Sequence, residues 1–276
     1  MIPPFVDADW LGQHRSEVVL VDVRWYLDGR SGRAAYETAH LPGAVFLELG
    51  EVLSAAPSES EGRHPLPGPE RFASGLGRLG IGADTTVVGY DDAGGAIAAR
   101  LVWMLRALGQ PAALLDGGLA AWPGRLQTGP SPAREARSVP PRPFPDHLLA
   151  TIDEVGGADA VLIDARDGAR FAGGPDPVDP RSGHIPGARS LPAAGNLDAE
   201  GRLRPPAELR RRFAQAGVDG RRPVISYCGS GVSACHNLLA LERAGLPLGR
   251  LYPGSWSQWS RDPQRPVETG PSVDAG

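Results

Sequence analysis

The most reactive side chain in the sequence lies in the stretch VISYCGSGVSACHN, residues 224–237. Its β-branched and aromatic residues predict a buried strand that ends at Tyr227, and the residues after the glycines predict a helix. Cys228 follows the strand directly, and a cysteine thiolate is a strong nucleophile. Cys228 is therefore the first candidate catalytic residue, whereas Cys235 lies among leucines in the predicted helix and is expected to pack in the core.

The residues after Cys228 are suited to holding negative charge on its sulfur. Glycines let the backbone curl, and a strand that passes directly into a helix leaves the first amides of the helix without internal partners. Those amides are expected to converge on the sulfur and, with two serine hydroxyls, to favour the thiolate. The predicted loop consists of Gly229, Ser230, Gly231, Val232 and Ser233.

Three kinds of chemistry use a loop of this form. Gly229, Gly231 and Ala234 fit the dinucleotide fingerprint G-x-G-x-x-A, but no acidic residue ends a following strand about 20 residues later. A cysteine phosphatase needs an arginine that closes the loop around the phosphoryl oxygens, and residues 229–235 contain none. The third is transfer of a sulfur atom through a persulfide on Cys228, which the same amides would stabilise as an anion.

Composition excludes several classes of function. All 28 basic residues are arginine, which excludes a lysine Schiff base and a lysine-dependent phosphate loop. The net charge of −4 argues against nucleic-acid or membrane-surface binding, and no apolar run could span a bilayer. We see no signal-peptide pattern and no disulfide framework, so a reducing, cytoplasmic location is expected. The six histidines lack metal-binding spacing, and no metal or cofactor is expected.

The sequence that surrounds the loop contains an internal repeat. Four blocks recur in the same order at an offset of about 140 residues, which indicates duplicated domains. They are VLVDVR and VLIDAR, AHLPGA and GHIPGA, TVVGYDDAGGA and PVISYCGSGVS, and LLDGGLAAW and LYPGSWSQW. We predict an N-terminal domain over residues 1–126, a proline-rich linker over 127–147 that partly wraps the surface, and a C-terminal domain over 148–276.

Within each half, short β-branched runs alternate with helical patterns. In the second half the predicted strands are residues 160–165, 188–193, 223–227 and 249–252. The predicted helices are residues 206–217 and 232–245, each ended by glycine. Strand–helix alternation predicts an α/β fold in which each half has a mostly parallel sheet with helices on both faces. Sites in such sheets form at the carboxyl ends of strands, where Cys228 lies.

The tandem repeat, the two H-x-P-G-A blocks, the CGSGVSACH loop and GSWSQW resemble the two-domain rhodanese-type sulfurtransferases. The resemblance implies two tandem rhodanese-like domains, and a Cys228 persulfide that passes its outer sulfur to a thiol such as thioredoxin, or to cyanide. The C-G-S-G-V-[ST] form of the loop is similar to that of members that use 3-mercaptopyruvate. Members that use thiosulfate typically carry an arginine and a lysine where Gly229 and Ser230 lie. The expected donor is 3-mercaptopyruvate; the alternatives are thiosulfate and, more distantly, a non-catalytic protein that binds sulfide or an anion.

Further roles follow from matching residues of the same family. DARDGARF is similar to the segment whose arginine binds the substrate carboxylate, which implies that role for Arg170. The family's second carboxylate-binding arginine corresponds at best to Arg181, which lies closer to His184 than the family pattern has it. RHPLPGPERF resembles a segment whose histidine faces the cleft, which implies a polar contact for His64.

Asp91 matches Cys228 in the first half of the repeat. Because a carboxylate cannot carry a persulfide, we expect a catalytically silent N-terminal domain that forms the opposite wall of a cleft between the domains. Asp22 and Asp164 end predicted strands and are expected to pair with nearby arginines.

Overall fold

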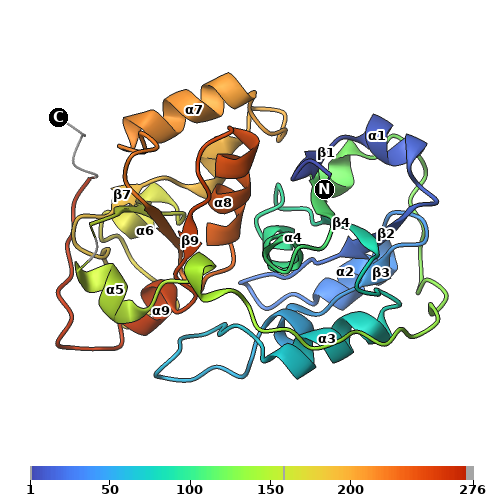
Figure 1. The fold of residues 1–276 in the computed structure, drawn as a ribbon, viewed down its shortest axis with the longest axis horizontal. Helices are drawn as coiled ribbons and strands as arrows, with labels where there is room; N and C mark the ends of the chain where they lie inside the picture. The colour runs from blue at the N-terminus through green and yellow to red at the C-terminus, as the bar shows by residue number, and fades with distance from the viewer. Residues whose placement is uncertain (1, 158, 272–276) are drawn as a thin grey trace. The chain divides into compact units, whose positions relative to one another are not determined.

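The computed structural model describes residues 2–157 and 159–271. Contacts divide the chain into two compact units, and each contains one parallel sheet (Figure 1). The first unit consists of Met1–Ala55, Leu66–Phe144 and Glu200–Arg202. The second consists of Ala56–Pro65, Pro145–Ala199 and Leu203–Gly276.

The sheet of the first unit has five described strands in the order β1-β5-β4-β2-β3, with every neighbouring pair parallel. They are β1 (Phe5–Val6), β2 (Val18–Asp22), β3 (Val45–Phe46), β4 (Thr86–Tyr90) and β5 (Ala112–Leu115). One face packs on α1 (Ala8–Gln13) and α2 (Gly32–Thr38), whose side chains share a buried core with β2, β4 and β5. The other face carries α4 (Ala98–Ala107), and Phe144 joins it to α3 (Pro69–Arg78).

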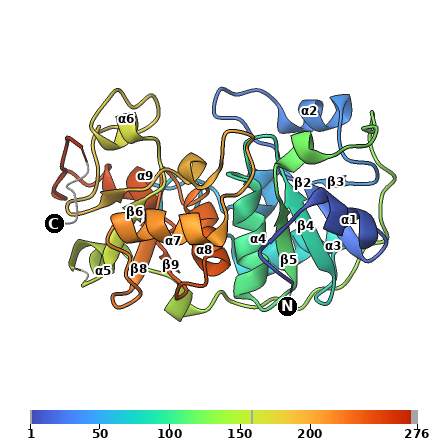
Figure 2. The same cartoon turned by 90° about the horizontal axis from the view of Figure 1, so that it is seen from above.

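The sheet of the second unit has the order β7-β6-β8-β9, and its neighbouring strands are also parallel. These are β6 (Val161–Asp164), β7 (Arg189–Ser190), β8 (Val224–Tyr227) and β9 (Arg250–Leu251). The helix α8 (Ala234–Arg243) packs on β8 and β9, and α7 (Pro206–Gln215) packs on α8 (Figure 2). The opposite core contains side chains of α5 (Ile152–Gly157), α6 (Gly168–Phe171) and α9 (Ser255–Trp259). The predicted α/β class with two parallel sheets is therefore confirmed.

The repeat is visible in the strand pairing. The central pair β2 and β4 of the first unit corresponds to β6 and β8 of the second, and β5 corresponds to β9. An isolated parallel bridge between Leu149 and Leu251 stands where β1 pairs with β5. Short turns of other helix types complete the units, namely η1 (Leu49–Leu53), η2 (Gly118–Ala121), η3 (Asp146–Leu148) and η4 (Ala193–Asn196).

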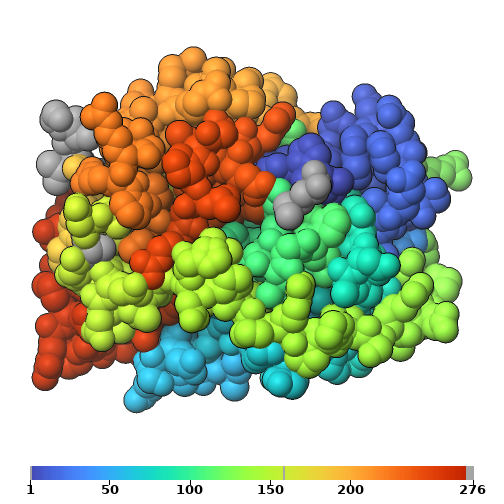
Figure 3. Space-filling view, viewed as in Figure 1, coloured from blue at the N-terminus to red at the C-terminus, as the bar shows by residue number. Residues whose placement is uncertain are grey.

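The proline-rich segment after residue 127 lies along the surface of the first unit (Figure 3). Residues 128–144 form no helix or strand. The amide of Arg137 donates to the carbonyl of Gly77 in α3 at 2.9 Å. A Cβ on Gly77 would lie 2.3 Å from the carbonyl oxygen of Arg137, so glycine is needed for this close approach.

Each central strand ends in an aspartate that binds an arginine two residues later. The Asp164 carboxylate accepts hydrogen bonds from the amide, Nε and Nη2 of Arg166, and both side chains are buried. Nη2 of Arg166 also donates to the carbonyl of Gly183, directly before the H-x-P-G turn. Asp22 and Arg24 form the same pair in the first unit, so each aspartate fixes the strand end to the turn that follows.

Candidate active site

Cys228 lies at the carboxyl end of β8, and its free thiol is 2% exposed. Its backbone is held on both sides by residues of α9. The amide of Cys228 donates to Oγ of Ser255 at 3.2 Å, and its carbonyl accepts from the amide of Trp256 at 2.9 Å. Ser255 has a φ of 52°, the one positive φ of a residue other than glycine in the described chain. A residue in a strained conformation therefore supports the reactive one.

The loop after Cys228 passes directly into α8. Gly231 has a φ of 74°, which favours glycine, and Val232 is 5% exposed. Oγ of Ser230, a residue that is 8% exposed, lies 2.8 Å from Nδ1 of His64. Ser233 is half-buried and directly precedes the helix. His64 belongs to the segment 56–65, which the contacts assign to the second unit, so this pair forms within one unit.

The first repeat shows what such a loop can bind. The Asp91 carboxylate lies where Cys228 lies in the repeat and is fully buried. Its Oδ1 accepts from the amides of Ala93 and Gly95 at 2.8 and 2.7 Å, and its Oδ2 accepts from those of Ile97 and Ala98 at 2.8 Å each. Burial raises the pKa of the Asp91 carboxyl, and the four amides oppose that shift. The loop thus directs four backbone donors at the side chain in this position.

In both repeats the first residue of the loop is also hydrogen-bonded to the short helix that follows the next strand, which is η2 after β5 and α9 after β9. In the first repeat the amide of Leu119 donates to the carbonyl of Asp91 at 2.9 Å, as Trp256 does to Cys228. In the second repeat, none of the described amides donates a hydrogen bond to Sγ of Cys228. A neutral thiol is a weak acceptor of hydrogen bonds, in contrast to the carboxylate of Asp91.

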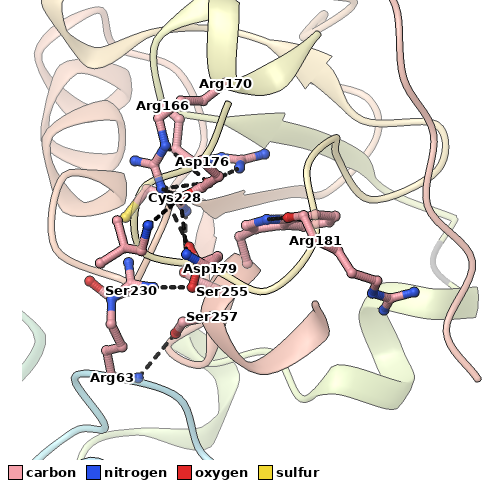
Figure 4. Close-up of polar contacts among 12 residues, drawn as sticks. Arg63, Arg166, Arg170, Asp176, Asp179, Arg181, Cys228, Ser230, Ser255 and Ser257 are labelled. Carbon is pink, nitrogen blue, oxygen red and sulfur yellow. Dashed lines mark hydrogen bonds and ion pairs between the residues drawn. The ribbon is translucent and has the colours of Figure 1, made fainter. Parts of the chain in front are cut away.

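Arg170, at the end of α6, reaches the loop. A Cβ placed on Gly229 would lie 3.6 Å from both Nη atoms of Arg170. The same guanidinium binds Asp176 through Nε and Nη2, with contacts of 2.9–3.2 Å, and Asp179 through Nη2 at 3.3 Å. The predicted donor-binding arginine is therefore beside the loop and already paired with two carboxylates (Figure 4).

The two carboxylates differ in their surroundings. Asp176 accepts from the amides of Val178 and Asp179 at 3.0 Å each. Burial alone would raise the pKa of Asp176, but these amides and the Arg170 guanidinium lower it overall. The pKa of Asp179 is raised because burial outweighs the neighbouring guanidinium groups. Asp179 is therefore the less strongly stabilised anion of the two.

Sequence reasoning missed Arg63. Its Nη1 binds Oδ1 of Asp179, and a Cβ on Gly229 would lie 3.0 Å from its Nη2. The single signal in the sequence is its position beside His64, because the surrounding residues predict an irregular polar segment. Segments of that kind reach a site through tertiary contacts that no local pattern encodes.

The structure does not bring Arg181 to the loop. Its guanidinium donates to the backbone carbonyls of Trp259, Ser260, Asp262 and Arg265, at 2.5–3.0 Å. Figure 4 shows this side chain directed away from Cys228. It lines a separate pocket of about 750 Å³ within the second unit. This geometry gives Arg181 the structural role of fixing the chain after α9.

The histidines of the two H-x-P-G turns are also structural. His40 Nδ1 lies 2.8 Å from the carbonyl oxygen of Tyr36, and His184 Nδ1 lies 2.8 Å from that of Phe171. In the part of the chain that the structure describes, no group of histidine, cysteine and acidic side chains is arranged to hold a metal ion. Nor is any helix there long and apolar enough to cross a bilayer.

Known proteins resemble the chain over almost its whole length. A family model described as a rhodanese-like domain matches residues 7–124 and again 145–262. The chain is 45% identical over 269 residues to the probable 3-mercaptopyruvate sulfurtransferase of Pseudomonas aeruginosa, with 92% of this chain and 93% of that protein covered. It is 41% identical over 264 residues to the putative thiosulfate sulfurtransferase SseB of Mycobacterium tuberculosis, with 92% and 91% covered.

The solved structures agree with this result. The crystal structure of SseA from Escherichia coli, described with the rhodanese fold, matches with a TM-score of 0.79 at 36% identity and covers 93% of this chain and 100% of that one. Both units thus have the same family assignment and the same parallel-sheet pattern. The chain belongs to the two-domain rhodanese-type sulfurtransferases and is an enzyme of that class.

Proposed function

We propose that the protein transfers a sulfur atom from 3-mercaptopyruvate to a thiol acceptor through a persulfide on Cys228. The observation that carries the proposal is the position of this free thiol. It begins a loop whose counterpart in the first repeat directs four backbone amides at a carboxylate. Amides in that arrangement would stabilise both the thiolate and the persulfide anion.

The reaction balances in two steps. The Cys228 thiolate attacks the sulfur of the donor, an S–S bond forms, and the bond between sulfur and carbon breaks. The electron pair of that bond stays on carbon as the enolate of pyruvate, which takes the proton from the donor's S–H group. Pyruvate leaves, and the outer persulfide sulfur then passes to an acceptor thiolate, which regenerates the Cys228 thiolate.

The neighbouring side chains have complementary roles in this proposal. Ser230 is positioned by its 2.8 Å contact with His64, so its hydroxyl can donate to the ketone oxygen as negative charge develops there. Arg170 lies beside Gly229 and would bind the donor carboxylate through its planar guanidinium. Arg181 has no part in the proposed site.

The choice of donor rests on charge. Residues 228–233 carry no charged side chain. A donor with a single carboxylate needs less positive charge from the loop than the thiosulfate dianion does. The similar proteins named above include one named for each donor, so thiosulfate is the alternative to be tested.

The remaining parts of the proposal concern the first unit and the acceptor. Because the carboxylate of Asp91 cannot carry a sulfane sulfur, we take the N-terminal rhodanese-like domain to be catalytically silent. A small thiol or a protein thiol such as thioredoxin would accept the sulfur. Since Cys228 must stay reduced between turnovers, a reducing compartment such as the cytoplasm suits the reaction.

Turnover and intact mass together test the proposal. Purified protein with 3-mercaptopyruvate and dithiothreitol should release pyruvate and sulfide. Protein exposed to the donor alone should gain the mass of one sulfur atom. Cys228→Ser should lose both the turnover and the mass gain.

Cys235→Ser is the matched control, because Cys235 is the other thiol and is buried in α8. It should keep the mass gain. If neither donor makes the wild-type protein heavier by one sulfur, the persulfide proposal is wrong. If thiosulfate gives the higher kcat/KM, the reaction class stands and the choice of donor is wrong.

A further inference from the structure

The second unit contains a pocket that the proposed reaction does not use. Its volume is about 750 Å³, which is within the range of small-molecule sites. The segment 56–65, α5 and the chain after α9 each contribute to its walls, and all three belong to the second unit. None of the described residues that line it belongs to the loop 228–233. The pocket is therefore separate from the proposed site on Cys228.

The wall formed by the chain after α9 is firmly held. The Arg181 guanidinium donates to four backbone carbonyls of residues 259–265 at 2.5–3.0 Å. The side-chain amide of Gln258 donates to the carbonyl of Ser60 and accepts from the hydroxyl of Tyr252 at 2.8 Å. Since Arg181, Gln258 and Ser60 all line the pocket, these bonds fix its shape before any ligand enters.

Ser260 supplies a polar group that lacks a partner. The residue lines the pocket and is 2% exposed. Its amide donates to the carbonyl of Trp256 at 2.8 Å, and its carbonyl accepts from Nε of Arg181 at 2.8 Å. Its buried Oγ, in contrast, forms no hydrogen bond with any residue that the structure describes. Because an unsatisfied buried hydroxyl costs free energy, a ligand in the pocket would gain by bonding to it.

Two side chains of opposite charge line the same pocket without an ion-pair partner. Arg261 is exposed, and its Nη1 donates to the carbonyl of Ser257 at 2.8 Å. Glu59 is exposed and comes from the segment 56–65. Neither forms an ion pair within the described part of the chain. The pocket thus offers one positive and one negative group from separate segments.

The charges around the pocket balance. The Arg265 guanidinium forms ion pairs with Asp153 and with Asp262, the latter at 3.4 Å. Three guanidinium groups and three carboxylates are present in all, and their formal charges sum to zero. The residues are Arg181, Arg261, Arg265, Glu59, Asp153 and Asp262. A ligand without net charge is therefore favoured, and the two unpaired groups favour one that carries both signs.

Apolar side chains complete the lining. Ile152 of α5 is half-buried, and Pro180 and Pro263 present ring carbons. A few fixed polar groups on an otherwise apolar surface are typical of small-molecule sites.

We propose that this pocket binds a zwitterionic α-amino acid with an apolar side chain. The ligand carboxylate would contact Arg261 and the Ser260 hydroxyl, and the ligand ammonium would contact Glu59. The site would be independent of the sulfurtransferase reaction, because no described residue of the loop 228–233 lines the pocket.

Equilibrium dialysis of the full-length protein against L-leucine tests binding. Two analogues of the same shape isolate the charges: 4-methylpentanoate lacks the ammonium group, and 3-methylbutylamine lacks the carboxylate. L-Leucine should bind saturably at one site, and each analogue should bind at least about tenfold more weakly. Equal binding of L-leucine and either analogue contradicts the zwitterion assignment.

Charge variants identify the pocket as the site. Arg261→Gln and Glu59→Gln should each raise the Kd for L-leucine by about tenfold. Arg222→Gln is the matched control, because Arg222 is an exposed arginine of the same unit outside the pocket lining, and its Kd should equal that of the wild type. If the two pocket variants bind as the control does, the assignment of the site is wrong.

Ser260→Ala has two opposite expected effects. It should raise the unfolding midpoint of the ligand-free protein, because it removes a buried hydroxyl without a partner. It should also weaken L-leucine binding by about threefold to tenfold. A lower midpoint in the ligand-free variant would show that the hydroxyl is satisfied without a ligand and would overturn its role.

Modified protein distinguishes this site from the donor site. Alkylation of Cys228 with iodoacetamide, verified by intact mass, should abolish turnover and leave the Kd for L-leucine within about twofold. Loss of binding on alkylation would place the ligand at the loop and overturn the inference. No saturable binding to the wild type at up to about 10 mM would overturn it as well, whereas the proposed sulfur transfer would stand.

Discussion

Replacement of Asp91 by alanine removes the acceptor at the centre of the first repeat's loop. Four backbone amides donate to this carboxylate at 2.7–2.8 Å. The residue is fully buried, so the amides cannot turn to bulk solvent when the carboxylate is lost. The variant therefore leaves buried donors without partners.

The expected loss of stability follows from those four amides. A single water that enters the space of the carboxylate can accept two of the hydrogen bonds. Each of the other two unsatisfied donors costs about 1–3 kcal/mol. Asp91→Ala should therefore lower the free energy of unfolding of the first unit by about 2–6 kcal/mol, well outside the range of ordinary surface substitutions.

Urea unfolding of the full-length chain measures this effect. Asp92→Ala is the matched control, because its side chain is the exposed neighbour and accepts a hydrogen bond from the hydroxyl of Tyr26 at 2.6 Å. Sulfate provides an independent arm. If the amides form an anion site, sulfate at ten times its dissociation constant should restore about 1.4 kcal/mol to Asp91→Ala. It should not do so in the wild type, whose carboxylate occupies the site.

Two results would refute this reasoning. Asp91→Ala could unfold within about 0.5 kcal/mol of the wild type, as Asp92→Ala is expected to do. Sulfate could also stabilise the variant and the wild type equally. In either case the loop does not select anions, and the argument that the same loop stabilises a Cys228 thiolate loses its structural basis.

Two further predictions concern the second unit. Ser255→Ala and Ser255→Gly both lose the hydrogen bond between Oγ and the amide of Cys228. Because glycine tolerates the φ of 52°, the free energy of unfolding of the glycine variant should be about 1–2 kcal/mol higher than that of the alanine variant. A lower value for the glycine variant in urea would show that this conformation is not strained. The Arg250 guanidinium and local hydrogen bonds with Thr151 lower the pKa of Glu154 to about 2. The ionised Glu154 carboxylate therefore contributes to the free energy of unfolding above the pKa of 4.5 that an unperturbed glutamate has, and this contribution is lost as the pH falls through about 2. The difference in unfolding midpoint between wild type and Glu154→Gln should therefore shrink between pH 4.5 and pH 2, and a constant difference would contradict this assignment.

Local patterns in the sequence predicted the parts of the fold that depend on local physics. The helices expected over residues 206–217 and 232–245 are present as α7 (Pro206–Gln215) and α8 (Ala234–Arg243). The strand expected to end at Tyr227 does end there. Buried β-branched runs and a repeated block order leave few alternative architectures, and the position of Cys228 follows from the connection between a strand and a helix.

Contacts made by irregular segments were not predictable in the same way. Arg63 reaches the loop because the turn before it packs on α9, which depends on the absence of a Cβ at Gly62. The pairing of Arg170 with Asp176 and Asp179 depends on how the segment between α6 and the H-x-P-G turn folds back. Neither arrangement has a periodicity that a sequence pattern could show.

The comparison of the two repeats explains how one loop can serve two purposes. In the first, the side chain at the centre is itself an acceptor of four amides, so the loop binds its own residue and stabilises the fold. In the second, the central side chain is a thiol, which makes no such demand on the amides in its neutral form. Donors that the backbone fixes in place can stabilise negative charge as it forms in a reaction. Exchange of one side chain, Asp91 for Cys228, therefore separates a structural anion site from a proposed catalytic one.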